Sequence, residues 1–188
     1  GTEDRLPRAR FVLSVLKAAV SFGVVCRLPG CRDFREVMSE MEFPTVPSRT
    51  WAPTAGQITA ARQAAHAAGA HSRALVYALQ FEATLRQWDI IGQWVPLSDP
   101  RPSAILHRGR KWIGPMWSQI DENLVFRFTP TKTEGTTGKE VAIDLSVCPR
   151  IMEELALIAP KQRKGPLIVN PTTVRPYRPD YFQKLWRT

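Results

Sequence analysis

Apolar residues recur at helical spacing in the first part of the chain. Across residues 6–25 the period is 3.6, and Lys17 lies off the apolar face. That face comprises Val12, Leu13, Leu16 and Val20. The pattern predicts a helix packed against other protein. No apolar run reaches the roughly 18 residues that a membrane span requires, so no membrane partner is expected.

A cluster of prolines follows a short helix expected over 34–41. Its members are Pro44, Pro47 and Pro53. Because proline disfavours helix at the preceding residue, the cluster indicates a linker. We therefore divide the chain into a helical unit at 1–45 and a second domain at 46–188.

Helical spacing returns after the prolines. Thr54 and Gln57 have the spacing of a capping box, in which each side chain satisfies an exposed backbone amide at a helix start. Helices are expected at 54–68, 72–85, 88–94, 149–158 and from 179 onward.

Between residues 124 and 145 the period changes from 3.6 to 2. Two stretches rich in β-branched and aromatic residues, 124–128 and 140–145, flank a turn with two glycines, which predicts a hairpin. A further short strand is expected at 167–169. The fold class predicted for this domain is α+β, mainly helical, with one small antiparallel sheet.

The chain is strongly basic, with 26 Lys and Arg against 17 Asp and Glu and a formal net charge of +9. On an otherwise ordinary globular composition, this excess favours a polyanionic partner such as nucleic acid. Two regions carry much of it: residues 160–188, and a cluster at 107–111 that is expected to form a loop. The candidate DNA-contacting residues are Arg108, Arg110, Lys111, Arg163, Lys164, Arg175 and Arg178.

Several classes of site are excluded by missing patterns. The three cysteines are too few for a disulfide framework and form no C-x-x-C pair, which favours a reducing cytoplasm. The three histidines lack metal-ligand spacing, so no metal is expected. Phosphate-loop, dinucleotide-binding and nucleophile-elbow motifs are absent from the sequence, and we expect no cofactor.

The strongest functional signal is a pair of segments. Residues 83–91, Ala-Thr-Leu-Arg-Gln-Trp-Asp-Ile-Ile, stand at a predicted helix-to-helix junction, and Lys132-Thr133 heads the predicted hairpin turn. The pair resembles the tyrosine recombinase (phage integrase) family. That family has its first catalytic arginine in a T-G-L-R-x-x-E-like motif between two helices, and its catalytic lysine as K-T on a β-hairpin. The resemblance implies catalytic roles for Arg86 and Lys132, with Asp89 in place of the supporting glutamate.

The likeness extends over nearly the whole chain. Residues 54–58 look like the helix that opens the family's catalytic domain, and 176–187 look like the segment before its second catalytic box. The resemblance implies that 1–45 is a helical remnant of a core-binding domain and that 46–188 is the N-terminal two-thirds of a recombinase catalytic domain. The family's H-x-x-R box, its later His or Trp and its nucleophilic tyrosine would lie beyond Thr188. We therefore expect a piece of a longer protein that binds DNA and is inactive alone.

The chemistry of strand exchange explains both residue types. Displacing a deoxyribose oxygen adds negative charge to the nonbridging phosphate oxygens, which a planar guanidinium such as Arg86 stabilises through two parallel hydrogen bonds. Lys132 would protonate the leaving 5′ oxygen. Structural alternatives stay open: Arg86 as an ion-pair partner of Asp89, and Lys132 as a turn residue that keeps a strand edge soluble. The sequence departs from the family at Ala83-Thr84, where Thr-Gly is usual.

The resemblance implies a parent protein that integrates or recombines DNA for a prophage or another mobile element. Its partner would be double-stranded DNA, on which full-length family members form tetramers, and its reaction would pass through a 3′-phosphotyrosyl intermediate. One alternative is a non-catalytic DNA-binding or regulatory remnant of an integrase. Another is a basic interaction protein with no nucleic-acid role.

Overall fold

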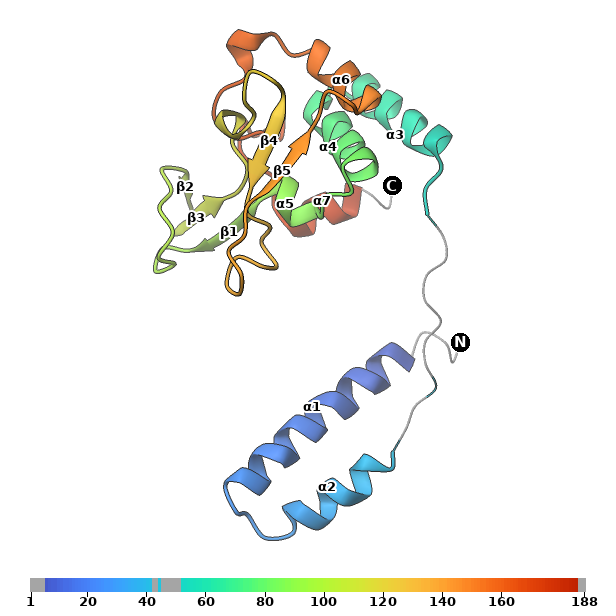
Figure 1. Cartoon of the computed structure of the whole chain (residues 1–188), viewed down its shortest axis with the longest axis vertical. Helices are drawn as coiled ribbons and strands as arrows, with labels where there is room; N and C mark the ends of the chain where they lie inside the picture. The colour runs from blue at the N-terminus through green and yellow to red at the C-terminus, as the bar shows by residue number, and fades with distance from the viewer. Residues whose placement is uncertain (1–5, 42–43, 45–51, 186–188) are drawn as a thin grey trace. The chain divides into compact units, whose positions relative to one another are not determined.

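The computed structural model describes residues 6–41, 44 and 52–185. The chain divides into two compact units, Gly1–Ala52 and Pro53–Thr188 (Figure 1). The division falls among the prolines, a few residues after the predicted boundary; Pro47 itself lies outside the described residues. In the described part of the chain, no helix has the length and apolar character needed to cross a membrane.

The first unit contains two packed helices, α1 (Leu6–Val25) and α2 (Cys31–Ser39). The bounds of α1 are those predicted, whereas α2 begins before residue 34 and ends before residue 41. Gly23 is buried where the chain turns back, and a Cβ at this position would lie 2.6 Å from the Cys31 sulfur. Glycine therefore permits the close approach of the two segments.

Most apolar side chains of this unit are exposed. Val12 and Leu16, on the face predicted to pack, are about half exposed, and Phe11 and Phe22 are more exposed still. Within the described residues, α2 thus covers only part of the apolar surface of α1.

The second unit is built around α4 (His71–Glu82), whose residues 74–79 are all buried. It packs against α3 (Ala55–Ala67) and α6 (Pro149–Ala156). The capping box before α3 is confirmed, since Thr54 Oγ1 accepts from the Gln57 amide and Gln57 Oε1 accepts from the Thr54 amide. The short helices α5 (Gln87–Ile91) and α7 (Pro179–Leu185) complete the α layer.

Two helices end three residues before their predicted ends. Helix α4 ends at Glu82 rather than at residue 85, and α5 ends at Ile91 rather than at residue 94. Gly92 stops α5 because its φ of +68° lies in the left-handed region, and a Cβ there would lie 2.6 Å from the Trp112 ring. The chain is then free to leave as a strand.

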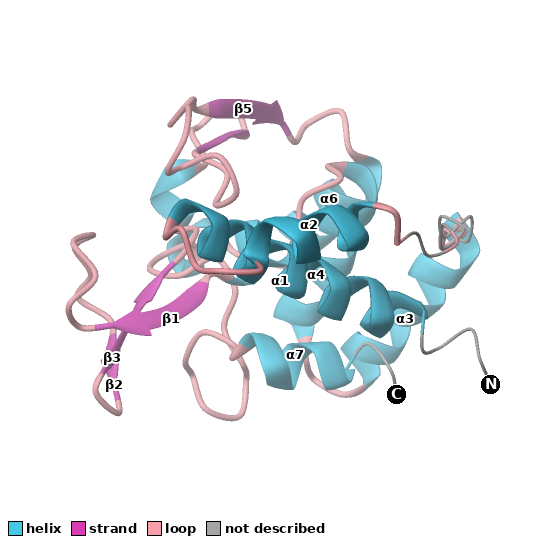
Figure 2. Ribbon diagram, turned by 90° about the horizontal axis from the view of Figure 1, so that it is seen from below, coloured by secondary structure: helices cyan, strands magenta, loops and turns pink. Residues whose placement is uncertain are grey.

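The described residues form two small antiparallel sheets rather than the single sheet predicted, and Figure 2 shows them as separate groups of strands. The expected hairpin is present as β4 (Val125–Phe128) and β5 (Val141–Asp144), paired along their whole length. The additional sheet has the order β1-β3-β2, and its strands are β1 (Gln93–Pro96), β2 (Leu106–His107) and β3 (Arg110–Ile113).

Three sequence predictions are corrected by this arrangement. Trp94 lies in β1 and not in a helix, and residues 107–111 form a hairpin and not an irregular loop. Residues 167–169 form no strand; isolated bridges at Pro166 and Asn170 flank them instead. The pairings of β1 with β3 join residues 14 to 20 positions apart. The residues of β1, Gln-Trp-Val-Pro, and of β3, Arg-Lys-Trp-Ile, do not alternate between polar and apolar, so no strand pattern marks them in the sequence.

Candidate functional site

The Arg86 corner connects α4 to α5. Leu85 is buried and anchors the connection, while Arg86 is the N-cap of α5 and its side chain is 59% exposed. Thr84 has φ +50°, the left-handed conformation that β-branched residues rarely adopt. The corner therefore presents a guanidinium to solvent from a sharply turned backbone.

Replacing Thr84 with Gly is expected to stabilise the second unit by about 1 kcal/mol, because a β-branched residue is strained at positive φ and glycine is not. Chemical denaturation measures the change. Thr59→Gly in α3 is the matched control and should destabilise, since its site is an ordinary helical position. A loss of stability in Thr84→Gly as large as that in the control would contradict this account of the corner.

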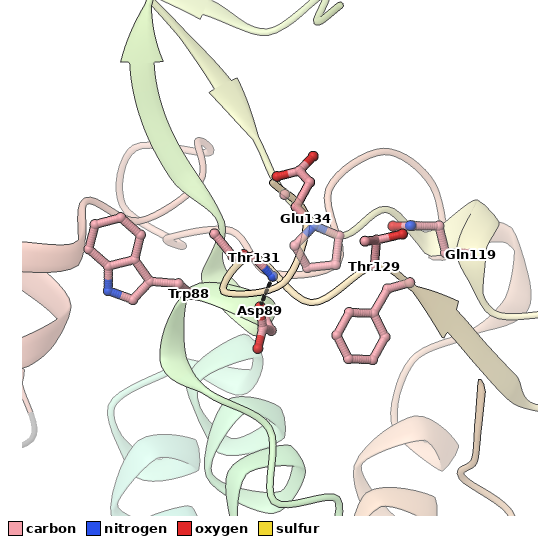
Figure 3. Close-up of a pocket in the computed structure, with 9 residues that line it drawn as sticks. Trp88, Asp89, Gln119, Thr129, Thr131 and Glu134 are labelled. Atoms are coloured by element: carbon pink, nitrogen blue, oxygen red, sulfur yellow. Dashed lines mark hydrogen bonds between the residues drawn. The ribbon is translucent and has the colours of Figure 1, made fainter. Parts of the chain in front are cut away.

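Asp89 connects the Arg86 corner to the Lys132 turn. Its carboxylate is 3% exposed; Oδ1 accepts a hydrogen bond from the Thr131 amide at 2.8 Å, drawn in Figure 3. The other oxygen lies 3.8 Å from Nη1 of Arg86. One buried carboxylate therefore holds the backbone next to Lys132, 42 positions later in the sequence, and also faces Arg86.

The turn that carries Lys132 is fixed on its other side as well. The amides of Thr133 and Glu134 both donate to the Pro130 carbonyl at 3.0 Å, and the Glu134 carboxylate accepts from Arg101 Nη1 at 2.7 Å. Lys132 is exposed between the hydrogen bond from Thr131 to Asp89 and the ion pair of Glu134 with Arg101. Its ammonium has no recorded ion-pair or hydrogen-bond partner among the described residues, so it is available to a ligand.

Arg101 is itself held rigidly. Its Nε and Nη2 donate to the two carboxylate oxygens of Asp99 at 2.9 and 2.8 Å. These hydrogen bonds from Arg101 lower the pKa of Asp99 to about 2. Sequence reasoning missed Arg101, Asp99 and Glu134, because an ion pair between residues 101 and 134 has no signature in local spacing.

A hollow of about 260 Å³ lies beside these anchors, and Figure 3 shows the side chains around it. Neither Arg86 nor Lys132 lines it, whereas the acids Asp89 and Glu134 do. Two carboxylates disfavour a phosphate inside the hollow. A phosphate held by Arg86 and Lys132 would therefore sit on the exposed surface.

The predicted DNA-contacting residues fall into two groups. Four are exposed without a recorded acidic partner among the described residues: Arg108, Arg110, Lys164 and Arg175. Arg178 is also exposed, and its guanidinium lies 3.3 Å from the Asp180 carboxylate.

The other two predicted DNA-contacting residues, Lys111 and Arg163, bind backbone carbonyls of the fold and are not free on its surface. Lys111 is buried, and its ammonium donates to the Asp99 carbonyl. Arg163 donates to the carbonyls of Leu155 and Ile158 at 2.7 and 3.1 Å, and so caps the C-terminal end of α6. Their predicted role in contacting DNA has no support from these contacts.

Two further features have structural rather than chemical roles. His66 is hydrogen-bonded to His71 and to Glu154, but no group of three or more potential ligands among the described residues is arranged to hold a metal ion. Burial raises the pKa of the Cys148 thiol, with the charges of Glu82 and Asp144 acting in the same direction. The thiol is therefore a poor nucleophile at neutral pH.

Comparison with protein-family models, with curated proteins and with solved structures gives no match to this chain. The functional argument therefore depends on the geometry of its own residues.

Proposed function

We propose that this chain is the DNA-binding part of a site-specific DNA recombinase of the tyrosine class, with Arg86 and Lys132 acting on one phosphate. The observation that carries the proposal is the Asp89 carboxylate, which contacts the Arg86 guanidinium and binds the amide next to Lys132. In this reading 1–45 belongs to a helical core-binding domain and 46–188 to the catalytic domain.

The backbone at Thr84 supports the proposal independently. The tyrosine recombinases usually have glycine at this place in their arginine motif, and Thr84 has the positive φ that glycine adopts without strain. A sequence that departs from the family pattern here thus keeps the backbone conformation that the pattern favours. The β4-β5 hairpin, with Lys132 at the start of its connection, agrees with the position of the family's lysine.

The proposed roles of Arg86 and Lys132 in strand cleavage follow from their exposed positive charges. In strand cleavage a nucleophile forms a new bond to phosphorus while the bond from phosphorus to the 5′ oxygen breaks. Arg86 would donate to the nonbridging oxygens, whose negative charge increases, and Lys132 would give its proton to the departing 5′ oxygen. No tyrosine of this sequence matches the family's nucleophile motif, so the chain is proposed to bind DNA without cutting it.

Fluorescence anisotropy with duplex DNA tests the proposal over about 50 to 300 mM NaCl, since phosphate contacts make log K fall linearly with log salt. Arg86→Ala and Lys132→Ala should each weaken binding and reduce the slope by about one. Arg127→Ala, an exposed arginine 3.7 Å from Asp121, is the matched control. A slope near zero for the unmodified chain would remove DNA as the partner.

A second measurement addresses the missing nucleophile. Incubation of the 188-residue chain with a nicked suicide substrate is expected to leave the DNA intact. Protein covalently attached to a 3′ end would show that one of its tyrosines is the nucleophile after all.

A further inference from the structure

The β2-β3 hairpin presents an arginine on a tight turn. His107 pairs with Arg110, and Arg108 and Gly109 connect them with φ values of +46° and +69°. Two consecutive positive φ values are typical of a type I′ turn, whose backbone matches the right-handed twist of the two flanking strands. Asparagine or aspartate usually precedes the glycine in this turn. Arginine at this position is strained, and strain that persists at an exposed tip points to a function of the side chain.

His107 is in contact with β1 and is subject to charges from two segments. The His107 ring meets the Trp94 ring of β1 edge-on, with 5.9 Å between centroids, and Arg110 Nη1 donates to the Trp94 carbonyl at 3.1 Å. The pKa of His107 is lowered first by burial, then by the charges of Arg175 and Arg108. Arg175 thus acts electrostatically on the hairpin although it lies more than sixty positions later in the sequence.

The segment that carries Arg175 is ordered by its own backbone. The Asn170 amide donates to the Arg175 carbonyl and the Val174 amide donates to the Asn170 carbonyl, both at 2.8 Å. The hydrogen bonds close a compact loop that holds Arg175 at its base. Two preformed backbone turns thus supply the cations, which limits the entropy lost when a ligand binds.

The positive charge at this place is not neutralised by acids. None of the ion pairs found among the described residues involves Arg108, Arg110 or Arg175. Asp99, the acid nearest in sequence before the hairpin, is bound to Arg101, and its backbone carbonyl accepts from Lys111. Arg108 and Arg175 act on one imidazole, and Arg110 lies on the same hairpin. Guanidinium groups match the geometry of phosphate oxygens, which suits this cluster to an anion.

We propose that His107, Arg108, Arg110 and Arg175 form one phosphodiester-binding site, distinct from Arg86 and Lys132, that takes up a proton when DNA binds. The identification of the ligand as DNA rests on the proposed function. A bound phosphate offsets the repulsion that Arg108 and Arg175 exert on the imidazolium. Arg110 is the charged residue that pairs with His107 from β3, and the uncharged Trp94 ring meets His107 from β1.

The sign of the pH effect follows from linkage. Without DNA the pKa of His107 is below its ordinary value, and a nearby phosphate raises it. DNA affinity is therefore greater when His107 is protonated and decreases as the pH rises through the pKa of the complex. The affinity is expected to change by up to about tenfold across this titration.

Anisotropy at constant ionic strength between about pH 5.5 and 8.5 tests the site, since histidine titrates in this range. The unmodified chain should bind more tightly as the pH falls, and His107→Gln should lose most of that dependence. Arg175→Ala should reduce the salt slope by about one, and Arg127→Ala should leave both properties unchanged. NMR should show the His107 pKa rising when duplex is added.

An unchanged pH dependence in His107→Gln, or a salt slope in Arg175→Ala equal to that of Arg127→Ala, would overturn the inference. If Arg86→Ala and Lys132→Ala weaken binding while these variants do not, only the second site fails. If the unmodified chain shows no salt-dependent binding to DNA, both the second site and the proposed function fail.

Discussion

Asp89→Ala is expected to destabilise the second unit by about 2 to 3 kcal/mol, because it removes a charged hydrogen-bond acceptor and leaves the Thr131 amide without its partner. The substitution also frees the Lys132 turn at one of its two anchors. Amide hydrogen exchange at Thr131 should accelerate, and DNA affinity should fall beyond the loss seen on replacing a surface residue. Urea denaturation and exchange together measure both effects.

Asp89→Asn is the matched control. Its amide oxygen accepts from the Thr131 amide as the carboxylate does, but its charge is lost, so a smaller destabilisation of about 1 kcal/mol is expected. Exchange at Thr131 should stay slow. Equal stability of Asp89→Ala and the unmodified chain, with slow exchange at Thr131, would show that this carboxylate does not hold the turn.

Arg62→Ala is expected to produce the largest loss of stability, about 3 kcal/mol, because it leaves a buried carboxylate without its main partner. Arg62 Nε donates to Glu154 at 2.6 Å, and Glu154 is 2% exposed. A second nitrogen of Arg62 reaches Glu153 at 2.8 Å. These bonds join α3 to α6, while His66 gives Glu154 a remaining partner.

The Arg62→Met/Glu154→Leu double variant separates charge from packing. Since both members of the buried pair are replaced by apolar groups, most of the stability lost in Arg62→Ala should return in thermal or urea denaturation. A double variant less stable than Arg62→Ala would mean that the ion pair itself, and not the uncompensated carboxylate, determines the effect.

Local patterns in the sequence were sufficient for some elements. The 3.6-residue period gave α1 its bounds, and the spacing of Thr54 and Gln57 predicted a capping box that is present. The alternation at 124–128 and 140–145 predicted the β4-β5 hairpin. Each of these signals is a periodicity or spacing inside a single segment, and can be recognised without knowing a distant partner.

Other elements depend on contacts between distant residues. The β1-β3-β2 sheet forms around Trp112, which is buried and donates from Nε1 to the Ile91 carbonyl at 3.0 Å. The spacing of residues 88–96 carries no sign of that partner and predicts a helix through Trp94 instead. Lys111 stands in a basic cluster that looks like exposed surface in the sequence. In the fold, β3 pairs with β1 and the Lys111 ammonium binds the Asp99 carbonyl.

The candidate site shows the same division. Arg86 and Asp89 are one helical turn apart, and their ion pair is visible in the sequence. The Thr131 amide, Glu134 and Arg101 join them only through the fold. Sequence reasoning therefore proposed the two cations but not the groups that hold the backbone beside them.

A double-mutant cycle on Arg86 and Lys132 tests the central claim most directly. The affinities of the unmodified chain, Arg86→Ala, Lys132→Ala and the double variant for the same duplex give the coupling energy. If both cations bind one phosphate, the two losses should depart from additivity by about 0.5 kcal/mol or more. Strictly additive losses would mean that the two residues contact separate phosphates, and would contradict a shared catalytic site.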